Sequence, residues 1–174
     1  MKYHAFWFVG LLWFALVLLL LGWFATEQLA VFDHNGKLYD KITQEDSLVA
    51  ALTASGAELP QGVKVAIHIE DKQCLCQWVA TKHIVSVKSL AEAQGFMNLS
   101  ITLDDIPSLQ DWIPSVPAII LLSERHDIVY AGPYSAGMYC SAGNGIVEPY
   151  ITKAPDLELG PAVPFDAEGC YCPQ

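Results

Sequence analysis

Positive charge is scarce in this sequence. Nine lysine and arginine residues stand against 19 aspartate and glutamate residues, the formal net charge is −10, and Arg125 is the sole arginine. A surface that binds nucleic acid needs clustered cations to neutralise phosphates. The composition therefore argues against a nucleic-acid partner, and we expect the acidic surface to serve solubility.

Charge is absent altogether from residues 5–25, "AFWFVGLLWFALVLLLLGWFA", a run of 21 residues. At about 1.5 Å per residue, a helix of this length matches the roughly 30 Å hydrocarbon core of a bilayer. A cleaved signal peptide is the alternative, but bulky Trp23 and Phe24 stand where a cleavage site needs small residues. Trp7 and Trp23 also suit the two membrane interfaces. We expect residues 5–25 to remain as a transmembrane anchor.

The flanks of this run favour a cytoplasmic N-terminus. Lys2 and the terminal amine precede the run and Glu27 follows it, although Lys37 and Lys41 beyond it act in the opposite sense. With this orientation the rest of the chain lies outside the cytoplasm. We expect a single-pass protein of the bacterial inner membrane whose C-terminal domain faces the periplasm.

The length of the chain predicts one folded domain behind the anchor. We expect an anchor over residues 1–26, an α/β domain over residues 27–152, and a proline-rich tail over residues 153–174 that is pinned to the domain rather than folded separately. His68 alternates within a strand that looks buried, and we expect it to be a core histidine with satisfied hydrogen bonds.

Hydrophobic periodicity and turn residues set the order of elements within the domain. The predicted order is β-prone runs on both sides of Asn35-Gly36, a helix from an N-cap at Thr43 to Gly56, a buried strand at 63–70, a helix at 77–94, a strand at 97–105, a short helix near 107–117, and a hairpin around 124–127. A short helix capped by Asn144 would follow, limited by Pro149 to about its first turn.

The sequence has no Cys-x-x-Cys motif, but it has two shorter ones. Four of its five cysteines form Cys74-Leu75-Cys76 and Cys170-Tyr171-Cys172, and the fifth is Cys140. Cysteines outside the cytoplasm tend to form disulfides, and an odd count leaves at least one thiol unpaired within the chain. The first motif opens a predicted helix, whose N-terminus lowers the pKa of a cysteine by stabilising its thiolate.

Three features together resemble the thioredoxin fold. The first Cys-x-Cys motif stands at the strand-to-helix junction after "VAIHIED", the tripeptide "SVP" directly precedes the strand "AIILL", and the hairpin runs into "YAGPYS". The resemblance covers about residues 28–152, and it is greatest to membrane-anchored bacterial thioredoxin-like proteins of uncharacterised function. It implies a mixed central sheet flanked by helices. The chain departs from the family pattern in having Cys-x-Cys in place of Cys-x-x-Cys.

The resemblance also implies roles for particular residues. Cys74 would be the exposed attacking thiol and Cys76 the resolving one. Pro117 would be the family's cis-proline, which turns the backbone of Val116 toward the site so that an extended substrate strand can pair with it. A disulfide across a one-residue spacing closes a tight ring, and strained disulfides are more oxidising, which favours an oxidant or isomerase.

The fold that the resemblance implies would gather the remaining cysteines at the same end of the domain. The second strand of the hairpin returns toward the active site, which would bring Cys140 close to Cys74. The tail has about twenty residues at roughly 3.3 Å each, so Cys170 and Cys172 could reach that end too.

Three functions follow from these cysteines. The first, which we favour, is an extracytoplasmic thiol–disulfide oxidoreductase or isomerase that acts on protein thiols or disulfides through Cys74 and Cys76 and needs no cofactor. The second is a module that binds Zn(II) or Cu(I) through both Cys-x-Cys motifs, with Cys140 or His83 as spare donors. The third is a non-catalytic domain in which Cys170 or Cys172 fastens the tail to Cys140.

Overall fold

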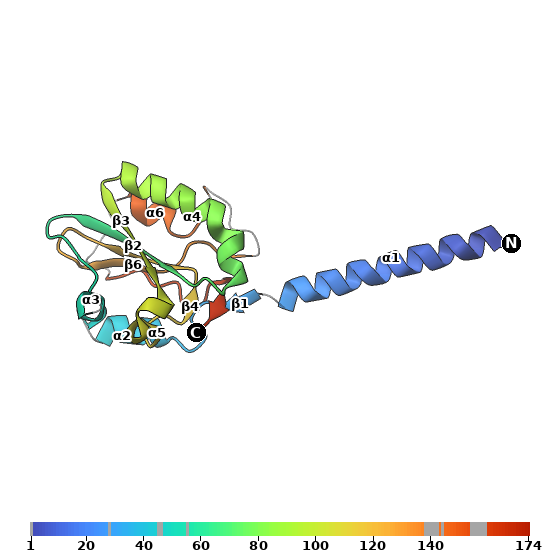
Figure 1. The fold of residues 1–174 in the computed structure, drawn as a ribbon, viewed down its shortest axis with the longest axis horizontal. Coiled ribbons are helices and arrows are strands. Elements are labelled where there is room, and N and C mark those ends of the chain that lie inside the picture. Colours follow the sequence, from blue (N-terminus) through green and yellow to red (C-terminus); the bar gives the residue numbers. More distant parts are fainter. Residues whose placement is uncertain are drawn as a thin grey trace.

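The computed structural model describes residues 2–27, 29–44, 47–54, 56–137, 143, 145–153 and 160–174. A long helix, α1 (Lys2–Glu27), projects from a mixed α/β domain (Figure 1). Within it, Phe6–Phe24 is long and apolar enough to cross a membrane, and none of this stretch is buried against the domain. The structure thus agrees with the sequence that one N-terminal apolar helix precedes the folded part.

A four-stranded mixed sheet forms the centre of the domain. Its strands are β2 (Lys64–Glu70), β3 (Phe96–Thr102), β5 (Ala118–Leu122) and β6 (Ile128–Pro133), in the order β3-β2-β5-β6. β2 pairs in parallel with β3 and antiparallel with β5, and β5 pairs antiparallel with β6. β2 lies inside the sheet and its five central residues are buried, which explains why its sequence is mainly apolar. The four strands of this sheet were all predicted from the sequence, and they are confirmed.

Helices cover both faces of this sheet and divide the core in two (Figure 1). On one face lie α4 (Leu75–Ala93) and the short α6 (Glu148–Thr152). On the other lie α2 (Lys37–Gln44), α3 (Ser47–Ala54) and α5 (Pro107–Gln110), the last preceded by a 3₁₀ turn over Leu103–Asp105. The long helix predicted at 77–94 is therefore confirmed as α4.

Two small sheets fasten the tail to the domain. β1 (Leu29–Val31) pairs antiparallel with β7 (Glu168–Cys170), and β4 (Ser115–Val116) pairs antiparallel with β8 (Cys172–Pro173). The described part of the tail is thus pinned along its length, as the sequence predicted. Neither pairing was predicted.

The segment after Asn35-Gly36 is a helix, so the prediction of a second β run there is wrong. The side chain of buried Asp33 accepts hydrogen bonds from the backbone N–H groups of Lys37 (2.9 Å) and Leu38 (2.8 Å), which satisfies the free donors of the first turn. Thr43 lies inside α2 and donates its hydroxyl to the carbonyl of Tyr39, so it is not the N-cap that we predicted.

The start of α6 shows how the sequence tolerates Pro149. The helix begins at Glu148, which places the proline in its first turn, where a missing N–H breaks no intrahelical bond. The predicted cap, Asn144, lies outside the described residues.

His68 is a fully buried histidine in the middle of β2, as predicted. Its Nδ1 lies 2.6 Å from the hydroxyl of Tyr134, and its Nε2 lies 2.9 Å from Oδ1 of Asn98. The amide of Asn98 is oriented by its Nδ2 donating to the carbonyl of Lys88, so Nε2 of the histidine donates and Nδ1 accepts. Burial lowers the pKa of His68 from 6.5 to about 4.

This lowered pKa predicts a stability that falls in mild acid. As the pH drops through 6.5 the unfolded chain takes up a proton before the folded chain does, so stability is full above pH 6.5 and declines toward pH 4. The slope is about 1.4 kcal/mol per pH unit. Thermal unfolding between pH 7 and 5 should show a smaller shift for His68→Gln than for the parent chain. His34→Gln, at an exposed histidine, is the control, and an unchanged slope in His68→Gln would refute this assignment.

Candidate functional site

The first Cys-x-Cys motif lies where β2 passes into α4. The connecting turn is held by the side chain of Asp71, which accepts the backbone N–H of Gln73 at 2.8 Å. Cys74 occupies the N-cap position with an extended backbone and Cys76 lies within the first turn. The free N–H groups and dipole of a helix N-terminus stabilise a thiolate, so Cys74 occupies the position that the sequence predicted for a reactive cysteine.

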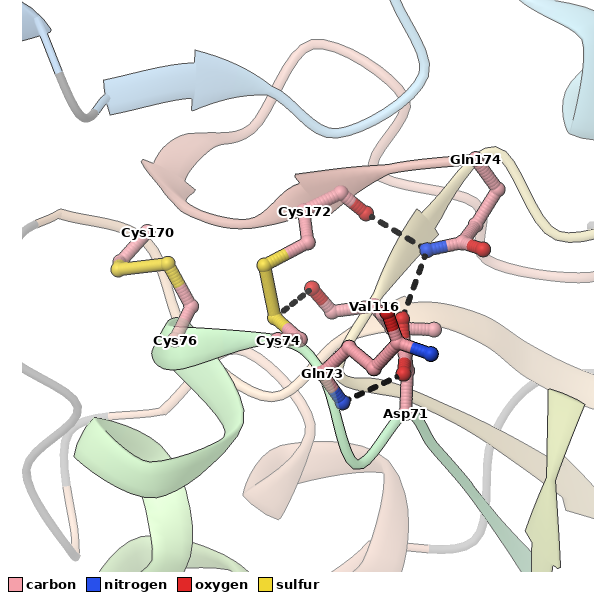
Figure 2. The surroundings of a disulfide bond; sticks show 8 residues. All are labelled: Asp71, Gln73, Cys74, Cys76, Val116, Cys170, Cys172 and Gln174. Atoms are coloured by element: carbon pink, nitrogen blue, oxygen red, sulfur yellow. Dashed lines mark hydrogen bonds between the residues drawn. A yellow bond between two sulfur atoms is a disulfide. The ribbon is translucent and has the colours of Figure 1, made fainter. Parts of the chain in front are cut away.

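Two disulfides join the first Cys-x-Cys motif to the second (Figure 2). Cys74 is bonded to Cys172 and Cys76 to Cys170, at sequence separations of 98 and 94. The sulfurs of Cys74, Cys76 and Cys172 all lie within 4.8 Å of one another. We call these four cysteines the sulfur cluster.

This pairing differs from the ones considered from the sequence. Neither motif is closed on itself, because β8 runs antiparallel to β4 and brings Cys172 opposite Val116, beside Cys74. The tail is fastened to the first motif rather than to Cys140, which lies outside the described residues. Cys170 and Cys172 do reach the end of the domain where Cys74 lies, as predicted.

Pro117 lies next to the sulfur cluster. The Val116–Pro117 peptide bond is cis, as the resemblance implied, and the carbonyl oxygen of Val116 lies 3.6 Å from Sγ of Cys74 (Figure 2). A disulfide sulfur has no hydrogen to donate, so this is a contact in the present state. If the disulfide were reduced, the Cys74 thiol could donate to the same oxygen.

The sulfur cluster is largely covered. Cys74 is 6% exposed and Cys76 4% exposed, whereas Cys170 and Cys172 are half-buried. The expectation of an exposed thiol at Cys74 is therefore wrong for this disulfide-bonded state, because the strand β8 is bonded to it. The more exposed cysteines are those of the tail.

Tyr171 anchors the tail between its two cysteines, a role that sequence reasoning missed. Its ring is buried, packs edge-on against Phe32 with centroids 5.4 Å apart, and its hydroxyl donates to the carbonyl of Ser135 at 2.6 Å. A Cβ at Gly169 would lie 2.6 Å from this hydroxyl, so the glycine permits the close approach. An aromatic residue between two cysteines was the signal available in the sequence.

His83 does not belong to the sulfur cluster, so the structure gives it no role as a spare metal donor. It is buried further along α4, with Nε2 2.7 Å from Oε1 of Glu148. Burial acts to raise the pKa of Glu148, but the hydrogen bonds from His83 and from backbone N–H groups outweigh it, and the pKa is lowered. This contact holds α6 against α4 and is structural.

The arrangement permits two kinds of chemistry. Neighbouring sulfurs within 4.8 Å can exchange disulfide bonds through a thiolate. If both disulfides were reduced, the same thiolates would form a set of soft ligands suited to zinc or copper(I). The described residues include no other group of metal-ligating side chains of this kind.

Comparison with known proteins places these residues in a family. A family model described as "Domain of unknown function (DUF6436)" matches residues 44–174. The chain belongs to the DUF6436 family. No curated protein and no solved structure matches the chain. Both Cys-x-Cys motifs and Pro117 fall inside the DUF6436 domain, whereas α1 and β1 precede the matched range.

The free energy of unfolding lost with a disulfide should depend on the order of removal: whichever of the two is removed first costs less than the one removed second. One cross-link over 98 residues stabilises by about 5 kcal/mol, while the second closes only a small additional ring and adds about 2 kcal/mol. Denaturation of the full chain in detergent, followed by circular dichroism, should therefore show a loss of about 2 kcal/mol for C76S/C170S or C74S/C172S, and of about 7 kcal/mol for the quadruple variant. Cys140→Ser is the control, and additive losses from the two pairs would contradict the linkage described.

Proposed function

We propose that this DUF6436 protein is a membrane-anchored, extracytoplasmic thiol–disulfide oxidoreductase or isomerase with a thioredoxin-like fold. The observation that carries the proposal is the position of Cys74. Its sulfur lies at the N-terminus of α4, beside Val116, and within reach of other cysteine sulfurs that can complete an exchange reaction.

The topology supports the thioredoxin-like part of the proposal. β2, α4 and β3 form a parallel βαβ unit, and β5 and β6 then extend the sheet as an antiparallel pair. The Cys-x-Cys motif follows the first strand of that unit, β2, and Pro117 directly precedes β5, the strand that pairs with β2. A reactive cysteine and the residues before a central strand thereby meet at one end of the sheet.

The chemistry is a pair of thiol–disulfide exchanges. The thiolate of Cys74 attacks one sulfur of a client disulfide, which forms a mixed disulfide and releases the other client sulfur as a thiolate. A neighbouring thiolate, from Cys76 or Cys172, then attacks Sγ of Cys74, which releases the client and leaves the protein with a disulfide. The client gains two electrons, and an external dithiol must supply them again; in the reverse direction the protein oxidises a dithiol client.

The cellular location is part of the same proposal. Disulfides form and persist in oxidising compartments, and α1 is apolar enough to hold the domain at a membrane. We place the chain in a bacterial inner membrane with residues 29–174 in the periplasm. The partners are protein thiols or disulfides, with the membrane contacted through residues 5–25.

This location predicts an uncleaved anchor. Chain expressed in a bacterium should have an intact mass that includes α1, should stay in the membrane pellet after alkaline washing, and should lose its domain to protease added outside spheroplasts. A cytoplasmic protein of the same cells, which must remain intact, is the control. A mature chain that lacks residues 5–25 would contradict the anchored topology.

A redox titration tests the activity. The protein is equilibrated in glutathione buffers of set potential, and the oxidation state of each cysteine is quantified by alkylation and mass spectrometry. At least the disulfide of Cys74 should open reversibly between about −120 and −270 mV, the range of known oxidoreductases. Cys74→Ser should abolish exchange with a client disulfide, whereas Cys140→Ser should not. Disulfides that all stay closed below about −300 mV would make the cysteines structural and refute the proposal.

Metal binding is a second candidate function because at least three cysteine sulfurs are already grouped. Metal analysis of protein purified under reducing conditions separates the two. Stoichiometric zinc or copper that is lost in C74S and C170S alike would favour a metal site, while reduced, metal-free protein that reforms Cys74–Cys172 would favour the redox function.

A further inference from the structure

The segment Cys172–Gln174 pairs with a short stretch of backbone beside Cys74. Its strand β8 pairs antiparallel with β4, with Cys172 opposite Val116 and Pro173 opposite Ser115. The backbone N–H of Gln174 donates to the carbonyl of Pro114 at 2.9 Å, which continues the pairing. We call the backbone of residues 114–116 the docking strip.

Few interactions hold this segment besides the disulfide. Outside the docking strip, the side chain of Gln174 reaches Oδ2 of Asp71 only at 3.5 Å (Figure 2). Both Pro173 and Gln174 are exposed. The preceding residues are held separately, because Tyr171 is buried and Cys170 is bonded to Cys76 and paired with Leu29. Opening the Cys74–Cys172 bond would thus release residues 172–174 while the rest of the tail stays in place.

The bound segment has the form of a captured client. It is an extended stretch of polypeptide, paired with backbone at the site, and its cysteine is bonded to Cys74. An external polypeptide that forms a mixed disulfide with Cys74 would need the same pairing partners. Both cannot occupy the docking strip at once.

We propose that Cys172–Gln174 is the resident occupant of a client-binding strip, and that clients are extended, cysteine-containing segments which take its place. The inference rests on the proposed oxidoreductase function and names its substrate class and its regulation. It also assigns the resolving role to Cys172, which lies in the same segment and returns to the strip as the client leaves.

A dithiol donor supplies the two electrons that the cycle passes to the client. One donor thiolate attacks Cys172, Cys74 leaves as the thiolate stabilised by α4, and the second donor thiolate releases Cys172 as the donor becomes a disulfide. The thiolate of Cys74 then attacks a client disulfide, and the thiolate of Cys172 attacks Cys74 to free the reduced client. The Cys76–Cys170 bond does not change, and buried Tyr171 also keeps Cys172 close by.

A groove indicates how a longer client would continue. It has a volume of about 210 Å³ and borders Pro173 and Gln174, with Phe32, Gln110 and Ser115 among its lining residues. A client that follows the path of β8 would place the residues after its cysteine along this groove. We therefore expect the client cysteine to be followed by at least two extended residues.

The test compares two variants of the full chain in detergent, both carrying Cys140→Ser. In the first, Cys172→Ser frees Cys74 but keeps residues 172–174; in the second, the chain ends at Tyr171, which also empties the docking strip. Each is mixed with a peptide copy of residues 171–174 whose cysteine carries a coloured aromatic thiol as leaving group. The same leaving group on glutathione serves as the small probe.

The expected result is a rate difference confined to the peptide. The shortened chain should react with the peptide about tenfold faster than Cys172→Ser, because two or three backbone hydrogen bonds become available to it. N-methylation of the peptide's glutamine, which removes the donor to Pro114, should lower the rate several-fold. With glutathione the two variants should differ by less than about twofold.

A second comparison tests the resolving role. The covalent adduct between Cys74 and the peptide should persist in Cys172→Ser. In C76S/C170S, whose Cys74–Cys172 bond is first opened with a dithiol that is then removed, the adduct should be released by Cys172. A Cys172→Ser chain that ends at residue 172, and so lacks only Pro173 and Gln174, repeats the rate test in case the shorter chain unfolds. Melting curves check that every variant is folded.

The outcomes separate the two proposals. Equal rates for both variants with both probes, with no effect of N-methylation, would overturn the occupant inference and leave the oxidoreductase function standing. Adducts released from Cys172→Ser as fast as from C76S/C170S would overturn the resolving role. Failure of Cys74 to react with either probe in every folded variant would overturn the proposed function and, with it, the inference.

Discussion

The pairing of residues 168–173 with β1 and β4 is the constraint on which the site depends. These strands are only two or three residues long, and yet they bring together the two cysteine motifs, which lie almost a hundred residues apart. Strands this short are not stable alone. Burial of Tyr171 and the two cross-links stabilise the pairing, and in return the pairing gives each sulfur a defined neighbour.

Local sequence patterns predicted most of the central layer of the fold. β2, α4 and the β5–β6 hairpin have strong periodicity and clear breakers, such as Gly95 in a left-handed conformation after α4. The failure at residues 37–44 has a local cause. Buried Asp33 lies four residues ahead of Lys37 and satisfies the first N–H groups of α2, a cap too remote in sequence for the usual signature.

The site was predictable in part for a different reason. The position of Cys74 at a helix start and the position of Pro117 are encoded by neighbouring residues, so both could be read locally. The partner of each cysteine is decided by a strand pairing between residues 115 and 173, and no local pattern encodes such a register. Cys172 is also flanked by a buried tyrosine on one side and an exposed proline on the other, an asymmetry visible only in the fold.

The short connection between α1 and β1 limits where the protein can work. Four residues lie between Phe24, the last of the apolar stretch, and Leu29, which is paired with Cys170, so the chain spans at most about 18 Å from one to the other. On the anchored topology the sulfurs are confined to a thin layer next to the lipid headgroups. Encounters then take place by diffusion in two dimensions, which favours partners that are themselves bound to the membrane over those dissolved in the compartment beyond.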